Sequence, residues 1–332
     1  MSTLRLGSRG SQLALFQARL VAQRIAERGG PVAEIVVIKT SGDRLADAPL
    51  SDVGGKRLFV KEIEEALLAG DVDLAVHSSK DMPAALLEGL AISAVLPRED
   101  PADALVLPAA APPSLDDIMA RRGAGTRVGT GSVRRIAQLR RLLPDAAFLN
   151  IRGNLDTRLR KLDAGDYDLL VLASAGLRRL GFTSRISARL PLDECIPAPG
   201  QGIIAIETRA DDEATRAHVG TVNDAEAAAA LEAERALVLA LGGGCQMPIG
   251  GVAVPEGSAS LTLRAIVASL DGARVVRCEK TGPKHHPAAL GQTVAEDLLS
   301  QGAAEILRDA QSPNPQSPNH PIPNPQSRIP NS

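Results

Sequence analysis

Along the first two hundred residues, short apolar runs alternate with segments whose apolar side chains recur every three or four residues. The short runs are typical of buried strands, and the longer pattern is typical of amphipathic helices. The predicted strands are residues 4–8, 34–39, 74–76, 127–128, 148–151, 169–172 and 203–206, and the predicted helices are residues 11–28, residues 59–69, a segment from Ser132 and one from about Leu155. This alternation predicts an α/β fold with mostly parallel sheets.

Two Pro-rich passages, residues 97–113 and 196–202, interrupt the alternation and indicate crossings between domains. Two crossings suit a pair of α/β domains joined by a two-strand hinge, as in periplasmic binding proteins, with the ligand between them. We therefore predict a first domain at residues 1–100 and 203–220, and a second domain at residues 106–198.

The character of the sequence changes near residue 224. An Ala-rich predicted helix at residues 225–241 is followed by predicted strands at 251–254, 261–269 and 275–279 and a predicted helix at 288–309. This order predicts a small C-terminal α+β domain at residues 224–310. Residues 311–332 are dominated by Pro, Asn, Gln and Ser, so we expect a disordered tail that buries no core.

Composition narrows the class of protein. With 332 residues, 44% of them hydrophobic, the chain can form two or three domains with real cores. No apolar run approaches the roughly 20 residues that span a bilayer, and the N-terminus lacks the apolar stretch of a signal peptide. Cys195, Cys245 and Cys278 lack CxxC spacing, which argues against a disulfide framework or a metal site. We expect a cytoplasmic protein, in a plastid only if a presequence has been removed.

The net charge of −2 conceals a local excess of arginine. Residues 121–160 contain ten arginines against two acidic residues, Asp145 and Asp156, and neither Lys nor Glu. Arginine without lysine indicates bidentate recognition of carboxylate or phosphate, although a solvated arginine-rich helix face would have the same composition. Nucleic acid is a further alternative, but aromatic residues make up only 2% of the chain and would offer few stacking platforms.

Two predicted strand–turn–helix junctions carry these arginines. The turn at residues 129–132 is followed by Arg134 and Arg135, and the second turn brings Arg152 and Arg158 near a helix start. Glycine-rich turns of this kind bind anions but are common, so each is a weak signal alone. In a parallel sheet both turns would face the same edge, where ligands bind.

Two further segments contain reactive side chains. His77 and Asp81 follow a buried strand; His77 is more often structural, and Asp81 could cap a helix, pair with Lys80 or Arg9, or act in catalysis. Cys245 lies among glycines, where an accessible nucleophile or attachment point competes with a buried structural role. We interpret the other two cysteines as structural.

Taken together, these segments resemble the porphobilinogen deaminase family from about residue 4 to about residue 309. The matching segments, in the family's order, are residues 50–56, 58–62, 75–83, 98–101, 128–135, 149–154, 199–202 and 243–250. The resemblance implies an enzyme, hydroxymethylbilane synthase, that joins four porphobilinogen molecules head to tail with loss of ammonia and releases the linear tetrapyrrole for haem or chlorophyll biosynthesis. It implies no metal.

The resemblance also implies roles for individual residues. Asp81 would be the catalytic carboxylate, and Cys245 would hold one covalent dipyrromethane cofactor per chain through a thioether. The residues implied to bind the cofactor are Ser78, Lys80, Thr130, Ser132, Arg134 and Arg135. Those implied to bind substrate and growing chain are Arg9, Ser11, Gln17, Lys56, Arg152, Arg158 and Arg179. Two positions depart from the family pattern: Gly131 replaces a frequent serine, and Asp52 replaces a frequent lysine.

Two alternatives from other classes remain. A two-domain anion-binding protein would use the arginines for a solute and leave Cys245 inert, but it explains neither the missing signal peptide nor a third domain. A nucleic-acid-binding regulator fits the basic stretch but shows no recognition motif. We expect porphobilinogen as the partner, no nucleic acid, no membrane, and a monomer.

Overall fold

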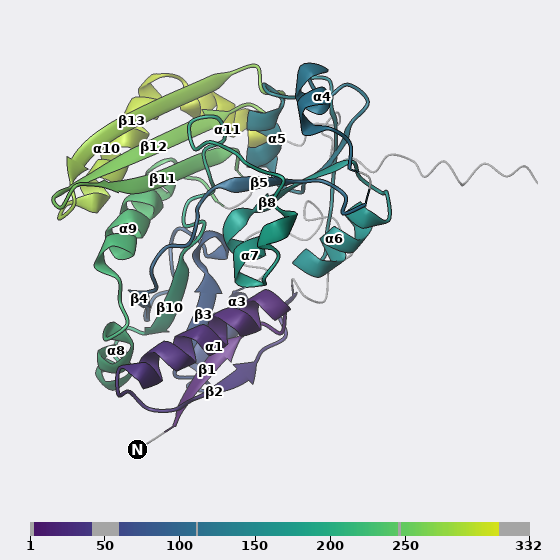
Figure 1. Ribbon diagram of the computed structural model, residues 1–332. Coiled ribbons are helices and arrows are strands. Elements are labelled where there is room, and N and C mark those ends of the chain that lie inside the picture. The colour runs from purple at the N-terminus through teal and green to yellow at the C-terminus, as the bar shows by residue number, and fades with distance from the viewer. Residues whose placement is uncertain (1–2, 42–59, 111, 245–246, 312–332) are drawn as a thin grey trace, which may run out of the picture.

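The computed structural model describes residues 3–41, 60–110, 112–244 and 247–311, which form three β-sheets with their helices (Figure 1). Two five-stranded sheets form the centres of lobe 1 and lobe 2. A three-stranded sheet forms the centre of the C-terminal part, which lies above lobe 1 in the view of Figure 1. The predicted pair of α/β units followed by a small α+β unit is confirmed.

Lobe 1 is built around a sheet with strand order β2-β1-β3-β10-β4. Its strands are β1 (Leu4–Ser8), β2 (Ala33–Val37), β3 (Leu74–Ser78), β4 (Leu90–Val95) and β10 (Ile204–Arg209). Its helices are α1 (Gln12–Glu27), α3 (Lys61–Leu68) and α8 (Glu213–Gly220), with a short 3-10 turn η1 (Ser79–Asp81) after β3. Leu6, Ile25 and Leu74 are fully buried, and α1 packs on the sheet through Ala18, Val21 and Ile25.

Lobe 2 repeats this design with strand order β7-β6-β8-β5-β9. Its strands are β5 (Asp103–Val106), β6 (Arg127–Gly129), β7 (Ala147–Leu149), β8 (Leu169–Ala173) and β9 (Ala188–Arg189). Its helices are α4 (Leu115–Ala120), α5 (Val133–Leu139), α6 (Leu155–Asp163) and α7 (Ser174–Arg179), with a 3-10 turn η2 (Thr183–Arg185). Strand β5 begins inside the predicted first crossing, so the expected domain boundary at residue 106 falls on a strand.

Both large sheets are mostly parallel, as predicted, but each contains one reversed strand. In lobe 1, β1 is parallel to β2 and β3, but β10 is antiparallel to β3 and β4. In lobe 2, β6 is parallel to β7 and β8, but β5 is antiparallel to β8 and β9. Both reversed strands, β5 and β10, follow a crossing from the other lobe, so they enter their sheet from the opposite end.

The C-terminal part stacks helices on an antiparallel sheet. Its strands are β11 (Ile249–Glu256), β12 (Ser260–Ala268) and β13 (Val275–Pro283), and its helices are α9 (Ala225–Ala240), α10 (Pro287–Ser300) and α11 (Ala303–Gln311). The single helix predicted at residues 288–309 is two helices. Gly302 has φ +97°, outside the helical region, and this residue ends the first helix before the second begins.

The two crossings lie side by side. The Glu99 N–H donates to the Gly202 carbonyl at 3.1 Å, and the Leu96 N–H donates to the Ile204 carbonyl at 3.1 Å. Gly202 has φ +90°, and a Cβ there would collide with the Glu99 carbonyl oxygen. Glycine is therefore required for the close approach of the two crossings.

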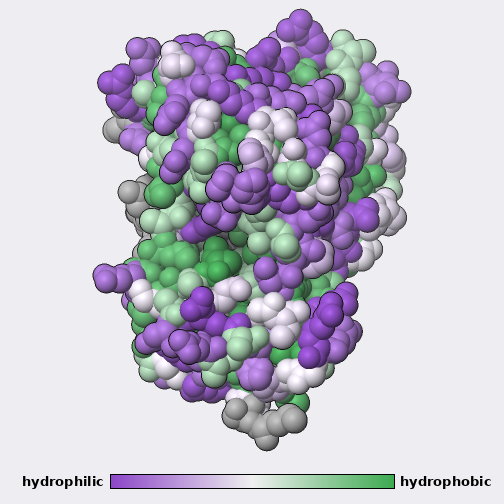
Figure 2. Space-filling model, turned by 90° about the vertical axis from the view of Figure 1, so that its left-hand side faces the viewer, coloured by the Kyte–Doolittle hydropathy of each residue, from purple (hydrophilic) through white to green (hydrophobic). Residues whose placement is uncertain are grey.

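Helix α9 faces lobe 1 across an apolar hollow (Figure 2). This cavity, of about 490 Å³, is lined by Leu86 and Ile92 of lobe 1 and by Leu231 and Leu239 of α9, among other residues. Leu239 remains 59% exposed there, so the C-terminal part does not close completely over lobe 1.

Candidate active site

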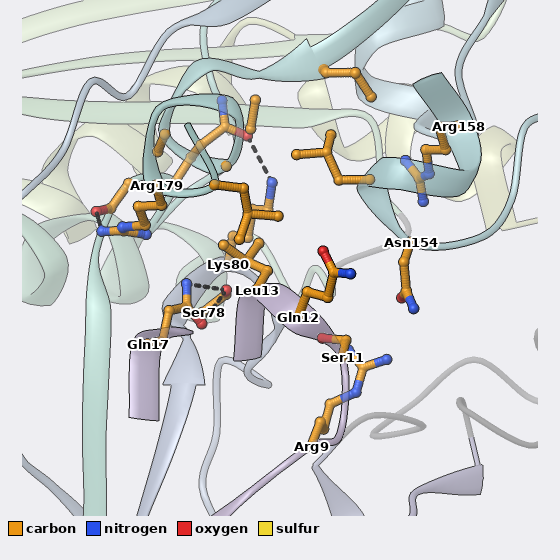
Figure 3. Close-up of a pocket in the computed structure, with 18 of the residues that line it drawn as sticks. Arg9, Ser11, Gln12, Leu13, Gln17, Ser78, Lys80, Asn154, Arg158 and Arg179 are labelled. Carbon is orange, nitrogen blue, oxygen red and sulfur yellow. Dashed lines mark hydrogen bonds between the residues drawn. The ribbon is translucent and has the colours of Figure 1, made fainter. Parts of the chain in front are cut away.

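A cavity of about 190 Å³ lies between the two lobes. It is lined by the start of α1, the end of β3, the start of α6, helix α7 and the second crossing. Eight of the residues singled out from the sequence line it: Arg9, Ser11, Gln17, Ser78, Lys80, Arg135, Arg158 and Arg179. In Figure 3, Arg9 and Ser11 lie on one side of this cavity and Asn154 and Arg158 on the other. The fold thus brings the start of α1 next to the second crossing, although the two segments are more than 150 positions apart in the sequence.

On the side of lobe 1, the start of α1 and the end of β3 are joined by side-chain hydrogen bonds. Ser11 is the N-cap of α1, and its hydroxyl accepts from the Ala14 N–H at 3.3 Å. One turn later, the buried Gln17 bonds Ser78, with 2.9 Å from Nε2 to Oγ and 3.1 Å from Oγ to Oε1. These contacts hold two hydroxyls at the cavity wall.

Lys80 and Asp81 extend from η1 directly after β3. Burial, together with the nearby Arg135 guanidinium, lowers the pKa of Lys80 to about 8, although Asp81 opposes the change. Asp81 lines an adjoining cavity of about 60 Å³ together with Arg9, Gln17 and other residues of the main cavity. A carboxylate therefore lies next to a pocket otherwise dominated by cations.

His77, the other candidate that follows β3 in the sequence analysis, is in a structural position. It is 5% exposed, and its Nε2 lies 3.0 Å from Oε2 of Glu207, which is fully buried on the neighbouring strand β10. These contacts fit a structural role for His77, which joins β3 to β10 through Glu207.

On the side of lobe 2, arginines converge near the start of α6. Arg158 Nε donates to the Gly153 carbonyl at 2.8 Å. Burial, together with Arg135 and Arg152, lowers the pKa of Arg158 to about 10, although Asp81 opposes the change. Arg135, from the first arginine-bearing turn, and Arg158, from the second, both line the main cavity.

Arg179 closes the cavity at α7. Its Nη2 donates to the Gly202 carbonyl at 2.7 Å, and burial lowers its pKa to about 10. The guanidinium is therefore bound to the second crossing while lining the cavity.

Arg134 and Arg135 share an acceptor that the sequence analysis did not single out. Arg134 Nη2 lies 2.8 Å from Oδ2 of Asp103, and Arg135 Nη2 lies 2.7 Å from Oδ1. Burial alone would raise the pKa of this fully buried carboxyl, but the two arginines hold it well below its usual range. Asp103 therefore fixes both guanidinium groups before any ligand arrives.

A third cavity, of about 70 Å³, adjoins the first at Lys80. It is lined by Ser132 and Arg134 of lobe 2 and by Gly244 and Met247, the described neighbours of the Cys245 loop. Cys245 itself lies outside the described residues, as does Lys56.

The turn before α5 contributes Thr130 and Ser132. Ser132 is the N-cap of α5, and its N–H donates to Thr130 Oγ1 at 3.3 Å. Thr130 is fully buried, so its position is beneath the turn. At position 131 this chain has glycine where the family frequently has serine. A Cβ at this position would lie 2.9 Å from Asn150 Oδ1, so glycine fits the local packing.

The other two cysteines occupy structural positions. Cys195 is fully buried in the core of lobe 2, and Cys278 packs against the core of the C-terminal part. Across the described residues, no helix is long and apolar enough to cross a membrane. The same residues contain no group of three or more His, Cys, Asp or Glu side chains placed to hold a metal ion.

The cavity walls carry an excess of positive charge. Five cations line the main cavity, Arg9, Lys80, Arg135, Arg158 and Arg179, against one carboxylate, Asp156. Such a surface suits a ligand with several carboxylates, because guanidinium groups bind carboxylates in a bidentate manner.

Comparisons with known proteins agree with this geometry. Residues 4–217 match the family model described as porphobilinogen deaminase, dipyromethane cofactor binding domain, and residues 228–300 match the porphobilinogen deaminase C-terminal domain. The porphobilinogen deaminase of Geotalea uraniireducens is 44% identical over 310 residues, which cover 93% of this chain and 95% of that protein. The porphobilinogen deaminase of Syntrophobacter fumaroxidans is 46% identical over 308 residues, covering 92% and 97%.

Among solved structures, a double mutant of the VFT2 domain of Bordetella pertussis BvgS is similar at 18% identity and a TM-score of 0.40, covering 66% of this chain and 86% of that one. This likeness is too distant to carry a functional inference. The two family models together cover most of the chain, and the bacterial relatives align over nearly their full length. The chain belongs to the porphobilinogen deaminase family.

Proposed function

We propose that this chain joins four porphobilinogen molecules head to tail, releasing one ammonia per ring, and then releases the linear tetrapyrrole hydroxymethylbilane by hydrolysis. The product would enter haem or chlorophyll biosynthesis. Beside family membership, the observation that carries the proposal is the cation-rich cavity between the lobes, with Asp81 at its edge.

The substrate explains the charge of the cavity. Porphobilinogen carries an acetate and a propionate group, so each added ring brings two negative charges. We propose that Arg9, Ser11, Gln17, Arg158 and Arg179, which line the main cavity, bind these groups, with Arg152 beside Arg158. A hydrogen bond to a charged group contributes roughly 1.5–3 kcal/mol, so several such contacts can retain a growing polyanion. We assign Lys56, outside the described residues, to the cover of this cavity.

The residues around the third cavity fit a dipyrromethane cofactor. We propose that Cys245 holds it through a thioether and that Ser78, Lys80, Thr130, Ser132, Arg134 and Arg135 bind its carboxylates or support the residues that do. Two buried polar atoms in the wall of this cavity, Ser79 Oγ and Arg134 Nε, have no hydrogen-bond partner among the described residues. Unpaired buried donors are costly, so they favour a bound acceptor. The cofactor would supply the free α-carbon to which the first substrate ring is joined.

We propose that Asp81 is the catalytic carboxylate, because it lines the small cavity that adjoins the cation-rich one. When porphobilinogen loses ammonia, its pyrrole becomes a cation, and a carboxylate near the ring nitrogen stabilises that charge. The same carboxylate can accept the proton that the α-carbon loses after the new C–C bond forms. A positioned acid or base contributes on the order of 10²–10⁴ in rate.

We further propose three domains that follow the three sheets: residues 1–100 with 203–220, residues 103–198, and residues 224–310. The start at residue 103 keeps β5 within one domain. We also propose a cytoplasmic monomer without nucleic-acid partners, supported by the sparse aromatic content and by the odd number of cysteines without CxxC spacing.

Mass spectrometry tests the function directly. After brief exposure to porphobilinogen, the intact protein should show a ladder of species, each heavier by one pyrrole unit, starting above the mass of the chain with its cofactor. A single unchanged mass, with no ammonia released, would contradict the proposal.

A further inference from the structure

The Lys80 ammonium lies where the main cavity and the cavity of the Cys245 loop meet, and it lines both. Its Nζ donates to Oε1 of Gln201 at 3.2 Å. Lys80 follows β3 of lobe 1, whereas Gln201 is in the second crossing. The position of this cation therefore depends on a residue of the hinge, not only on its own lobe.

The orientation of the Gln201 amide is fixed by its surroundings. Gln201 is 1% exposed, and its Nε2 donates to the Pro101 carbonyl at 2.7 Å and to Asp103 Oδ1 at 2.9 Å. Both partners can only accept a hydrogen bond, and the Lys80 ammonium can only donate. The amide oxygen must therefore face Lys80, because rotating the amide by 180° would break all three contacts.

Asp103 continues this chain of contacts into lobe 2. The oxygen that accepts from Gln201 also accepts from Arg135 Nη2 at 2.7 Å and Nε at 3.1 Å. Arg135 lines the main cavity together with Lys80. Two cations from different lobes are thus connected through one buried carboxylate and one buried amide.

We propose that Gln201 is a positioning residue, which fixes the Lys80 ammonium at the junction of the two cavities and ties it through Asp103 to the Arg135 guanidinium. This inference rests on the proposed function, in which Lys80 binds carboxylates of the cofactor. Its consequence is that the two cations keep a set separation when carboxylates reach them, although they belong to different lobes.

The charge of Lys80 gives a direct readout of this contact. Burial is the largest cause that lowers the pKa of Lys80 to about 8; Arg135 and Arg134 also lower it, while Asp81 and Asp103 raise it. An acceptor bonded to the ammonium favours the charged form. Loss of the Gln201 oxygen should therefore lower the pKa further, and this change can be measured without an activity assay.

The experiment uses the holoenzyme and three variants, Gln201→Met, Gln201→Glu and Gln138→Met. Gln138 is a matched control, because it is 2% exposed and also binds the second crossing, with 2.8 Å from the Ile196 N–H to its Oε1. Brief labelling with acetic anhydride over a range of pH, followed by peptide mass spectrometry, gives the midpoint at which the Lys80 amine becomes reactive. Urea unfolding measures the stability of each variant.

We expect the Lys80 midpoint to fall by about one unit in Gln201→Met, the size of an ordinary change in hydrogen bonding to a charged group. In Gln201→Glu the midpoint should not fall, because an acceptor remains although both N–H donors to Asp103 and Pro101 are lost. In Gln138→Met the midpoint should stay at the wild-type value while stability decreases. An unchanged midpoint in Gln201→Met, or an equal fall in Gln138→Met, would overturn the inference.

The pH profile of kcat/KM separates this inference from the proposed function. If Lys80 binds carboxylates as an ammonium, the alkaline limb of the profile should move to lower pH in Gln201→Met, together with the labelling midpoint. A midpoint that moves without any change in the kinetic profile would uphold the positioning role of Gln201. The same outcome would refute the assignment of Lys80 to carboxylate binding.

Discussion

Arg98 Nη1 lies 2.5 Å from Glu234 Oε1, in an ion pair that joins the first crossing to helix α9 of the C-terminal part. Glu234 is fully buried, and it also accepts from the Gly200 N–H at 2.5 Å and from the Ala253 N–H at 2.7 Å. Gly200 belongs to the second crossing and Ala253 to β11. One carboxylate therefore holds both crossings and the C-terminal sheet together.

Glu234→Ala should lower the free energy of unfolding by about 3–5 kcal/mol, because it leaves the Arg98 guanidinium and two N–H groups without their acceptor. Urea unfolding would measure this loss. Glu232 lies on the same helix but is exposed, so Glu232→Ala should change stability by no more than about 0.5 kcal/mol. Equal effects of the two substitutions would show that the junction contributes little.

Cys245→Ala should yield a folded protein without the two extra pyrrole units, and therefore without activity. Intact mass and Ehrlich's reagent, which colours pyrroles, would both show the loss. Cys278 is the control, since it is partly buried and packs against the core of the C-terminal part. Cys278→Ala should keep the added mass. Retention of the added mass in Cys245→Ala would move the attachment point elsewhere.

Asp81→Asn should reduce kcat by about 10²–10⁴, because the amide retains the size of the carboxylate but not its charge or basicity. The cofactor should stay attached, since Cys245 and the arginines are unchanged, and intact mass would verify this. Steady-state kinetics would separate chemistry from binding. A raised KM with an unchanged kcat would make Asp81 a binding residue only.

Arg158→Leu should reduce kcat/KM by about 10- to 100-fold, the equivalent of one charge-assisted hydrogen bond, mainly through a higher KM. Arg160 is its control because it lies on the same helix, is exposed, and bonds Thr157 at 3.2 Å. Arg160→Leu should keep kcat/KM near the wild-type value. If both variants lost activity equally, the general charge of α6 rather than the position of Arg158 would matter.

Cys195 should resist alkylation in the native protein from pH 7 to pH 10. Burial raises the pKa of its thiol to about 12, with Asp103 adding to this and Arg134 and Arg135 opposing it. The reactive thiolate is thus scarce throughout this range, and the side chain is inaccessible. Iodoacetamide labelling with peptide mass spectrometry would test this, with urea-unfolded protein as the reactive reference. Rapid native labelling would mean that lobe 2 opens locally.

Much of this architecture could be predicted from the sequence because burial leaves a periodic pattern. Helix α1 and seven of the ten strands that the structure describes in the two lobes follow from apolar spacing, whereas β4, β5 and β9 were not predicted. Ser11 and Ser132 stand at helix starts as N-caps. The arginine-rich turns also indicated a site that binds carboxylates. These features depend on neighbours within a few residues, so local patterns reveal them.

Long-range pairing could not be predicted in the same way. The directions of β5 and β10 depend on which lobe the chain comes from, and no local pattern records this. Asp103 is separated by about thirty positions from the two arginines that it binds, and Gln201 by more than a hundred from Lys80. In the sequence, Gln201 stands in the second Pro-rich passage, at residues 196–202. A single amide side chain among the Pro and Gly residues of that crossing was the available signal.

The close contact between Glu99 and Gly202 has a mechanical consequence. Two connections joined by backbone hydrogen bonds form a two-stranded ribbon. Such a ribbon bends readily about one axis but resists twisting and sideways sliding. Bending about that axis would change the width of the outer part of the cavity, while Lys80 and Arg135, tied through Gln201 and Asp103 beside the crossings, would stay at the same separation. We therefore expect a lengthening product to be accommodated away from the crossings.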